Sequence, residues 1–120
     1  MNYHKKIGNM YENLACQILE KNNYKILDRN YTGEHGEIDI VASFQNTIVF
    51  VEVKYRKNLQ FGDSFDAITK TKLRRMYLTA NEYIYENNLF DEIIRFDCIC
   101  FLAENFSWQK NILWGDEIGF

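Results

Sequence analysis

The chain has 120 residues, of which 47% are hydrophobic and 16% aromatic, and its formal net charge is −3. This length and composition predict one domain, over residues 1–120, with a packed hydrophobic core. No segment is long and apolar enough to cross a bilayer, and residues 1–10 lack the apolar stretch of a secretory signal. We therefore expect a cytoplasmic protein that makes no membrane contact.

The hydrophobic pattern predicts helices and strands in a defined order. A helix is expected over residues 8–23, with an apolar stripe at helical spacing formed by Tyr11, Leu14, Ala15, Ile18 and Leu19. The elements expected after it are a strand over 24–31, a hairpin with strands over 37–44 and 47–55, a polar loop over 57–64, a long helix over 65–87, a strand over 93–102 and a weaker strand or irregular segment over 106–114. The order αβββαβ predicts an α/β fold with a mixed central sheet flanked by helices.

The three cysteines are an odd number and do not predict a disulfide framework. Cys98 and Cys100 are two residues apart in a predicted strand, so their side chains are expected to fill one face of that strand. Metal binding by the two thiolates is the alternative, although this spacing is too short for the usual zinc pairings.

The strand predicted over residues 47–55 carries two charged residues, Glu52 and Lys54, among apolar ones. Buried ionic groups are strongly destabilising unless they are paired, hydrogen-bonded or metal-bound. A spacing of two places both side chains on the same side of the strand. One interpretation is a partly exposed ion pair at a sheet edge, and the other is a functional site.

The register of the predicted hairpin decides whether Asp39 joins this pair. With a two-residue connection, Asp39 lies directly across from Glu52, and a loop shifted by one residue at both ends pairs Asp39 with Lys54 on the same side. A three-residue loop would turn Asp39 to the opposite side. Two-residue loops are common in hairpins, although Gln-Asn is not their preferred sequence. Facing carboxylates would share a proton or bind a divalent cation, and oxygen ligands beside one lysine suit Mg²⁺ or Mn²⁺ and phosphoryl chemistry.

Charge is distributed unevenly along the chain. Residues 31–53 carry four acidic and no basic residues, whereas residues 54–75 carry seven basic residues against two acidic ones. Such a basic block suits a polyanion-binding surface beside a metal site, and a solvated helix face is the alternative. Residues 76–120 carry eight acidic residues against two basic ones, which suits a protein partner or an oligomer contact. The seven residues of the basic block are Lys54, Arg56, Lys57, Lys70, Lys72, Arg74 and Arg75.

Two charged residues lie within or near the apolar faces of the predicted helices. Lys72 falls inside the apolar arc of the long helix, so its amine either escapes to solvent or reaches the carboxylate face or a bound phosphate. Arg75 flanks the same edge. Glu12 lies near the stripe of the first helix and is either an exposed first-turn residue favoured by the helix dipole or a side chain directed toward the sheet.

Several segments in one collinear order resemble a known family. GEIDIVA, VFVEVKYR, FG, AITKTK and RFD, within roughly residues 8–101, resemble the YraN-like family of small bacterial proteins, which are predicted to be nuclease-like. The resemblance implies the PD-(D/E)XK fold, which is restriction-endonuclease-like, with an αβββαβ core shared with archaeal Holliday-junction resolvases. Ile38 replaces the proline of the superfamily signature.

The resemblance also implies roles for individual residues. Asp39 resembles the metal-binding Asp, and Glu52 and Lys54 resemble the (D/E)-x-K pair. Glu12 resembles the helix acid that completes the metal site, and Lys72 aligns with a basic position in the long helix. Because resolvase-like relatives are dimers, a homodimer is a further expectation, although no sequence feature marks a dimer surface.

The leading hypothesis is a nucleic-acid-binding, Mg²⁺- or Mn²⁺-dependent endonuclease that hydrolyses phosphodiester bonds in DNA rather than RNA, with structured or branched DNA as candidate substrate. Asp39 and Glu52 would hold the cation, together with Glu12 and the Val53 carbonyl, and Lys54 would orient the water or stabilise the transition state. The residues expected to contact phosphates are Lys72, Arg75, Arg56, Lys57, Lys70 and Arg74.

Two hypotheses from other classes stay open. One is a nucleic-acid-binding module without cleavage, and the other is a protein-interaction domain in which the charged cluster is a structural network.

Overall fold

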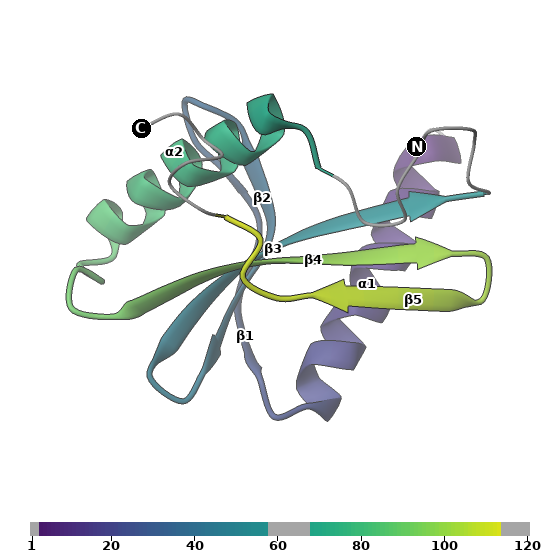
Figure 1. Ribbon diagram of the computed structural model, residues 1–120, viewed down its shortest axis with the longest axis horizontal. Coiled ribbons are helices and arrows are strands. Elements are labelled where there is room, and N and C mark those ends of the chain that lie inside the picture. Colours follow the sequence, from purple (N-terminus) through teal and green to yellow (C-terminus); the bar gives the residue numbers. More distant parts are fainter. Residues whose placement is uncertain (1–2, 58–67, 114–120) are drawn as a thin grey trace.

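The structure, a computed structural model, describes residues 3–57 and 68–113. Figure 1 shows a twisted sheet with a helix on each side. The elements in these two ranges are α1 (Tyr3–Lys21), β1 (Lys25–Thr32), β2 (Glu37–Phe44), β3 (Thr47–Arg56), α2 (Lys70–Glu86), β4 (Ile93–Leu102) and β5 (Asn105–Gln109). The predicted α/β class, with a mixed sheet flanked by helices, is confirmed.

The strands form one five-stranded sheet in the order β1-β2-β3-β4-β5. Neighbouring strands are antiparallel except β3 and β4, which are parallel. A parallel pair requires a crossover connection, and α2 lies within that connection. The sheet is therefore mixed because a single helical crossover is inserted into a succession of hairpins.

Each face of the sheet buries its own hydrophobic cluster under one helix. Alternate residues of β3 point to opposite faces, so Val49 and Val51 pack with Leu19 of α1, whereas Phe50 packs with Met76 of α2. In Figure 1, α1 passes behind the sheet and α2 lies at its upper left. The two helices therefore cover opposite faces of the sheet. The even-numbered residues of β3 point their side chains toward α2.

The predicted boundaries agree best where the chain is most buried. The strands at 37–44 and 93–102 begin and end as predicted, and the weak segment near the C-terminus forms a short strand. The first helix was predicted to begin at Gly8 but begins at Tyr3, and Leu14 of its predicted stripe is 38% exposed. The long helix was predicted over 65–87 but spans Lys70–Glu86, because Thr69 caps it and residues 68 and 69 are not helical. Residues 58–67, which include most of the predicted polar loop, lie outside the described residues.

The cysteines are buried and unbridged, as the prediction of a filled strand face requires. Cys98 and Cys100 pair with Glu52 and Lys54 of β3, and both thiols are fully buried. Within residues 3–57 and 68–113, no helix has the length and apolar character needed to cross a membrane.

A buried carboxylate on the α1 side joins β4 to β5. The two oxygens of Asp97 accept hydrogen bonds from Arg95, from the Trp108 indole nitrogen and from the backbone N–H of Asn111, all at 2.9–3.0 Å. Arg95 also donates to the Tyr24 hydroxyl at 2.6 Å. A fully buried charge with this many donors is compensated, so we interpret Asp97 as structural.

Candidate metal and phosphate site

The hairpin register places Asp39 across from Glu52. The paired residues run from Phe44 with Thr47 to Ile40 with Val51, which is the register of the two-residue loop. Gln45 in that loop has a φ of 55°, which a tight hairpin turn requires. The next positions along the two strands are Asp39 and Glu52, and both line the same cavity.

The β2–β3 ladder stops at Asp39, where a side chain replaces the backbone. The paired residues of the two strands end at Ile40 and Val51, and the Val53 N–H donates instead to the Asp39 carboxylate at 2.8 Å. Regular alternation also breaks here, because Ile40 packs on the α1 side whereas Ile38 packs on the α2 side. The two strands therefore separate at the acids, which opens space for a ligand between them.

Lys72 of α2 reaches the second acid. Its Nζ lies 2.7 Å from Oε1 of Glu52, and Glu52 is 4% exposed whereas the Lys72 side chain is 52% exposed. The helix begins at Lys70 because the Thr69 hydroxyl caps it by accepting from the Lys72 N–H at 3.2 Å. Of the two alternatives for Lys72, the side chain takes the one directed at the carboxylates.

The surroundings of Asp39 and Glu52 raise the pKa of both carboxyl groups. Burial, followed by repulsion from Glu52, raises the pKa of Asp39 to about 8. Burial also raises the pKa of Glu52, although Lys72, Asp39 and Lys54 partly offset this. Desolvation alone would lower the pKa of Lys72, but the bond to Glu52 raises it above its usual value. At neutral pH, Asp39 therefore holds a proton that a cation could displace.

The paired acids line a cavity of about 290 Å³ between β2, β3 and α2, bordered by the residues Gly36, Glu37, Asp39, Glu52, Lys72, Arg75 and Met76. A larger cavity of about 670 Å³ lies between α2 and residues 32–35. We assign the candidate site to the smaller cavity, because the larger one contains neither of the facing acids nor a lysine or arginine.

Glu12 extends the acidic group toward α1. One oxygen from each of Glu12, Glu37 and Asp39 lies within 4.8 Å of the others. Oε1 of Glu12 is buried and accepts no hydrogen bond, and Arg29 approaches it at 3.6 Å. Because α1 begins at Tyr3, Glu12 is not in its first turn, and the interpretation as an exposed first-turn residue is wrong.

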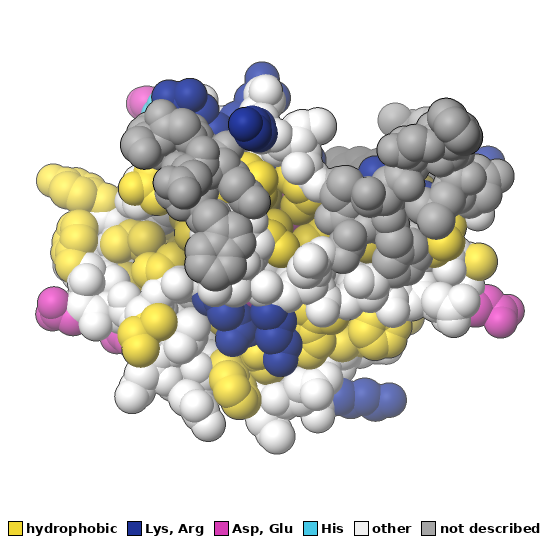
Figure 2. All heavy atoms as spheres, in the orientation of Figure 1, with side chains coloured by type: hydrophobic (Ala, Val, Ile, Leu, Met, Phe, Trp, Pro, Cys, Tyr) yellow, Lys and Arg dark blue, Asp and Glu magenta, His cyan; other side chains and the backbone are white. Residues whose placement is uncertain are grey.

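Besides Glu12, five of the predicted residues do not border this cavity: Lys54, Arg56, Lys57, Lys70 and Arg74. Lys54 is half-buried two residues after Glu52, and its charge lowers the pKa of Glu52. Arg56 and Lys57 follow at the end of β3. On α2, exposed side chains of the basic block (Lys70, Lys72, Arg74 and Arg75) lie along its first half. Figure 2 shows Lys and Arg side chains gathered at the upper edge, over the beginning of α2.

Glu37 was not among the predicted site residues. It lies two residues before Asp39 in β2, and one of its oxygens lies within 4.8 Å of oxygens of Asp39 and Glu12, although the alternation of β2 is irregular at this point. The signal in the sequence was GEIDI, where both acids are visible at a spacing of two.

The sequence comparisons decide the family. The sequence model described as "Uncharacterised protein family UPF0102" matches residues 11–101. The chain belongs to the UPF0102 family. This is the YraN-like family that the motifs resemble.

Members of UPF0102 from distant bacteria are similar over most of their length. A UPF0102 protein of Fusobacterium nucleatum is 47% identical over 97% of this chain and 98% of the relative. A UPF0102 protein of Vibrio parahaemolyticus is 38% identical over 91% and 93%, and one of a Sulfurihydrogenibium species is 45% identical over 77% and 80%. These names state the family and no activity.

Proposed function

We propose that this chain is a Mg²⁺- or Mn²⁺-dependent endonuclease of the PD-(D/E)XK superfamily that hydrolyses phosphodiester bonds in DNA. The observation that carries the proposal is the apposition of Asp39 and Glu52 beside the Lys72 ammonium, in a cavity bordered by exposed residues. A purely structural ion pair would need only one of the two acids. The second acid, with a pKa of about 8, is better explained by a cation site.

The donor set fits a hard divalent cation. Glu12 contributes a buried oxygen that accepts no hydrogen bond, and Asp39 contributes an oxygen within 4.8 Å of it. Carboxylate oxygens are the ligands that Mg²⁺ and Mn²⁺ prefer. Asp39 would hold the cation with Glu52 and Glu12, and Glu37 and the Val53 carbonyl are further candidate ligands.

A bound Mg²⁺ or Mn²⁺ would supply a water of lowered pKa and would offset negative charge on the phosphate. Lys54 would orient that water or stabilise the negative charge of the transition state. Lys72 lies at the mouth of the cavity with half of its side chain exposed, so its ammonium would contact a non-bridging phosphate oxygen. Arg75 borders the same cavity and would contact a neighbouring phosphate.

The exposed basic residues of α2 would bind the DNA backbone without reading its sequence, and Arg56 and Lys57 would extend this surface. The expected substrates are structured or branched DNA, with DNA preferred over RNA. Light scattering on the purified chain would measure whether it forms the homodimer that the resemblance implies.

The test is cleavage of a panel of duplex, flap and four-way-junction DNA with Mg²⁺ or Mn²⁺. Glu52→Gln keeps the shape of the side chain, and we expect it to lower the rate at least about 100-fold because a charged ligand is lost. Glu104→Gln, an exposed residue between β4 and β5, is the matched control and should cleave like the wild type. A wild type that yields no metal-dependent product would contradict the proposal, and salt-sensitive binding without cleavage would support a non-catalytic nucleic-acid module.

A further inference from the structure

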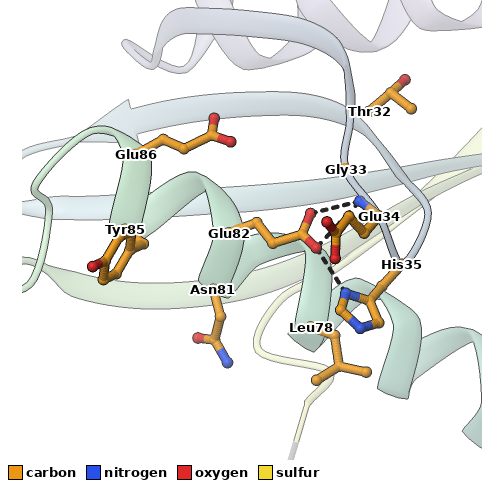
Figure 3. Close-up of a pocket in the computed structure, with 9 residues that line it drawn as sticks. All are labelled: Thr32, Gly33, Glu34, His35, Leu78, Asn81, Glu82, Tyr85 and Glu86. Atoms are coloured by element: carbon orange, nitrogen blue, oxygen red, sulfur yellow. Dashed lines mark hydrogen bonds and ion pairs between the residues drawn. The ribbon is translucent and has the colours of Figure 1, made fainter.

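The loop between β1 and β2 is held by a carboxylate of α2. The oxygens of Glu82 lie 2.9 and 3.2 Å from the backbone N–H of Glu34, which donates to them, and Nδ1 of His35 lies 2.7 Å from Oε1 of Glu82. Figure 3 shows the Glu82 side chain extending from α2 to this loop. The loop leads directly into β2, whose first and third residues are Glu37 and Asp39.

The loop is shaped to receive that carboxylate. The Gly33 N–H donates to the Gly36 carbonyl at 2.8 Å and closes the turn. A Cβ at Gly33 would overlap Oε2 of Glu82, so the carboxylate occupies the space of a side chain. Gly36 has a φ of 148°, which disfavours other residues, and a Cβ there would lie 3.5 Å from the Thr79 hydroxyl oxygen of α2. The Glu82 carboxylate therefore contacts the Gly33 end of the loop directly, whereas the Gly36 end meets α2 at ordinary contact distance.

One helix thus contacts both halves of the candidate site. Lys72 contacts Glu52 of β3, and Glu82 contacts the loop that precedes the acids of β2. The two residues are ten positions apart, which corresponds to about 15 Å along a helix. The paired residues of β2 and β3 end at Ile40 and Val51, so pairing between these two strands does not extend to the two acids, although β2 stays paired with β1 there. A rigid helix that contacts both halves of the site can fix the separation of the two acids.

We propose that Glu82 is a positioning residue that holds Asp39 opposite Glu52 by anchoring the β1–β2 loop to α2. The inference deepens the proposed function and rests on it for its relevance to cleavage, but the anchoring itself can be measured in the metal-free chain. Its direct indicator is the hydrogen bond from the Val53 N–H to Asp39, which forms only while the acid lies between the strands.

The experiment measures amide hydrogen exchange of Val53 in the full chain without divalent cations. Glu82→Ala removes both loop contacts, and we expect Val53 to exchange about tenfold faster while the amides of β4 keep their wild-type rates. Glu82→Gln retains an oxygen that can accept from Glu34 and should restore exchange to within about threefold of the wild type. Asn81→Ala is the matched control, because its side chain points away from the loop in Figure 3.

A second variant keeps the inference testable if Glu82→Ala does not fold. Gly33→Ala places a methyl group where the carboxylate lies, so it should displace the Glu82 side chain and accelerate Val53 exchange in an otherwise wild-type chain. Wild-type Val53 exchange in a folded Gly33→Ala chain, or in a folded Glu82→Ala chain, would overturn the inference.

Mn²⁺ affinity, measured by calorimetry, links the positioning to the proposed function. We expect Glu82→Ala to weaken Mn²⁺ binding about tenfold, as is typical when the support of a ligand is removed. A wild type that neither binds Mn²⁺ nor cleaves DNA would refute the proposed function, while Val53 exchange would still decide the positioning role.

Discussion

Lys72 and Glu52 form an ion pair of 2.7 Å in which the acid is buried and the ammonium is half-exposed. The ammonium neutralises the same negative charge that would attract a divalent cation. We therefore predict that Lys72→Met tightens Mn²⁺ binding several-fold and lowers DNA cleavage. Without a cation, the loss of the pair should lower the free energy of unfolding by about 1–2 kcal/mol, less than for a fully buried pair because solvent screens the ammonium.

Calorimetry with Mn²⁺ and urea unfolding with and without the cation measure both effects. Lys70→Met, an exposed lysine at the start of the same helix, is the control and should leave Mn²⁺ affinity unchanged. Unchanged Mn²⁺ affinity in Lys72→Met would argue that the cation does not bind beside Glu52.

The raised pKa of Asp39 predicts how the stability of the metal-free chain depends on pH. A carboxyl whose pKa rises from 3.8 to about 8 on folding binds its proton more tightly in the folded state. Its stabilising contribution is therefore complete below the unfolded pKa and is lost as the pH rises toward 8. We expect a loss on the order of 2 kcal/mol between pH 5 and pH 8.5 in the wild type, discounted for the coupling between the two acids.

Asp39→Asn should remove most of this pH dependence, because the amide does not titrate. Urea unfolding at pH 5 and pH 8.5 without divalent cations measures how the free energy of unfolding changes with pH. Glu104→Gln is the control and should show the same change as the wild type. A wild type equally stable at both pH values would mean that Asp39 ionises normally. Added Mn²⁺ should stabilise the wild type more at pH 8.5 than at pH 5, since the cation competes with the proton.

Asp97 should behave as a structural acid, in contrast to Asp39. Asp97→Asn removes the charge that Arg95 contacts through two hydrogen bonds in the interior. We predict a loss of about 2–4 kcal/mol in the free energy of unfolding, because a guanidinium is left without its partner. Chemical unfolding followed by Trp fluorescence measures the loss. The exposed Asp91→Asn should be neutral, and Mn²⁺ affinity should stay unchanged in both variants.

Arg75 should contribute to DNA binding through phosphate contact. Its exposed side chain borders the cavity, so Arg75→Ala should weaken binding on every sequence and lower the slope of log affinity against log salt by about 0.9. Fluorescence anisotropy of labelled DNA, measured at a series of salt concentrations with Ca²⁺ in place of Mg²⁺, gives this slope. Lys21→Ala, at the end of α1, should leave it unchanged. An unchanged slope in Arg75→Ala would exclude a phosphate contact by this residue.

The facing acids could be predicted because their placement is local. Asp39 and Glu52 belong to one hairpin with a two-residue loop, and the period of a strand then fixes which side each faces. Glu37 shows the same spacing of two from Asp39 in the sequence, but its place in the acidic cluster depends on the irregular geometry of β2 at this point. Helical periodicity left two alternatives for the Lys72 amine, an escape to solvent or a contact with the carboxylates or a phosphate. The packing of α2 on the sheet decides between them, because it brings the amine to Glu52.

The contacts of Glu82 and Asp97 with distant parts of the chain could not be predicted from the sequence. Glu82 contacts a loop 48 residues earlier in the chain, and Asp97 depends on Arg95 together with residues on β5 and beyond. Arg95 lies two residues from Asp97 in β4, a spacing that strand geometry predicts, but the contact between Glu82 and the loop and the bond from Asn111 to Asp97 follow from no such spacing. They form only when α2 packs on the sheet and β5 pairs with β4.

The sequence by itself determined the family, the order of helices and strands, and the pairing of two acids across a hairpin, because each depends on neighbours in the chain or on motif order. Only the tertiary structure decided that β2 and β3 separate at Asp39, that Glu12 and Glu37 join it, and that α2 contacts both strands. These features depend on how two helices pack on opposite faces of a twisted sheet, which brings together side chains that no local spacing connects.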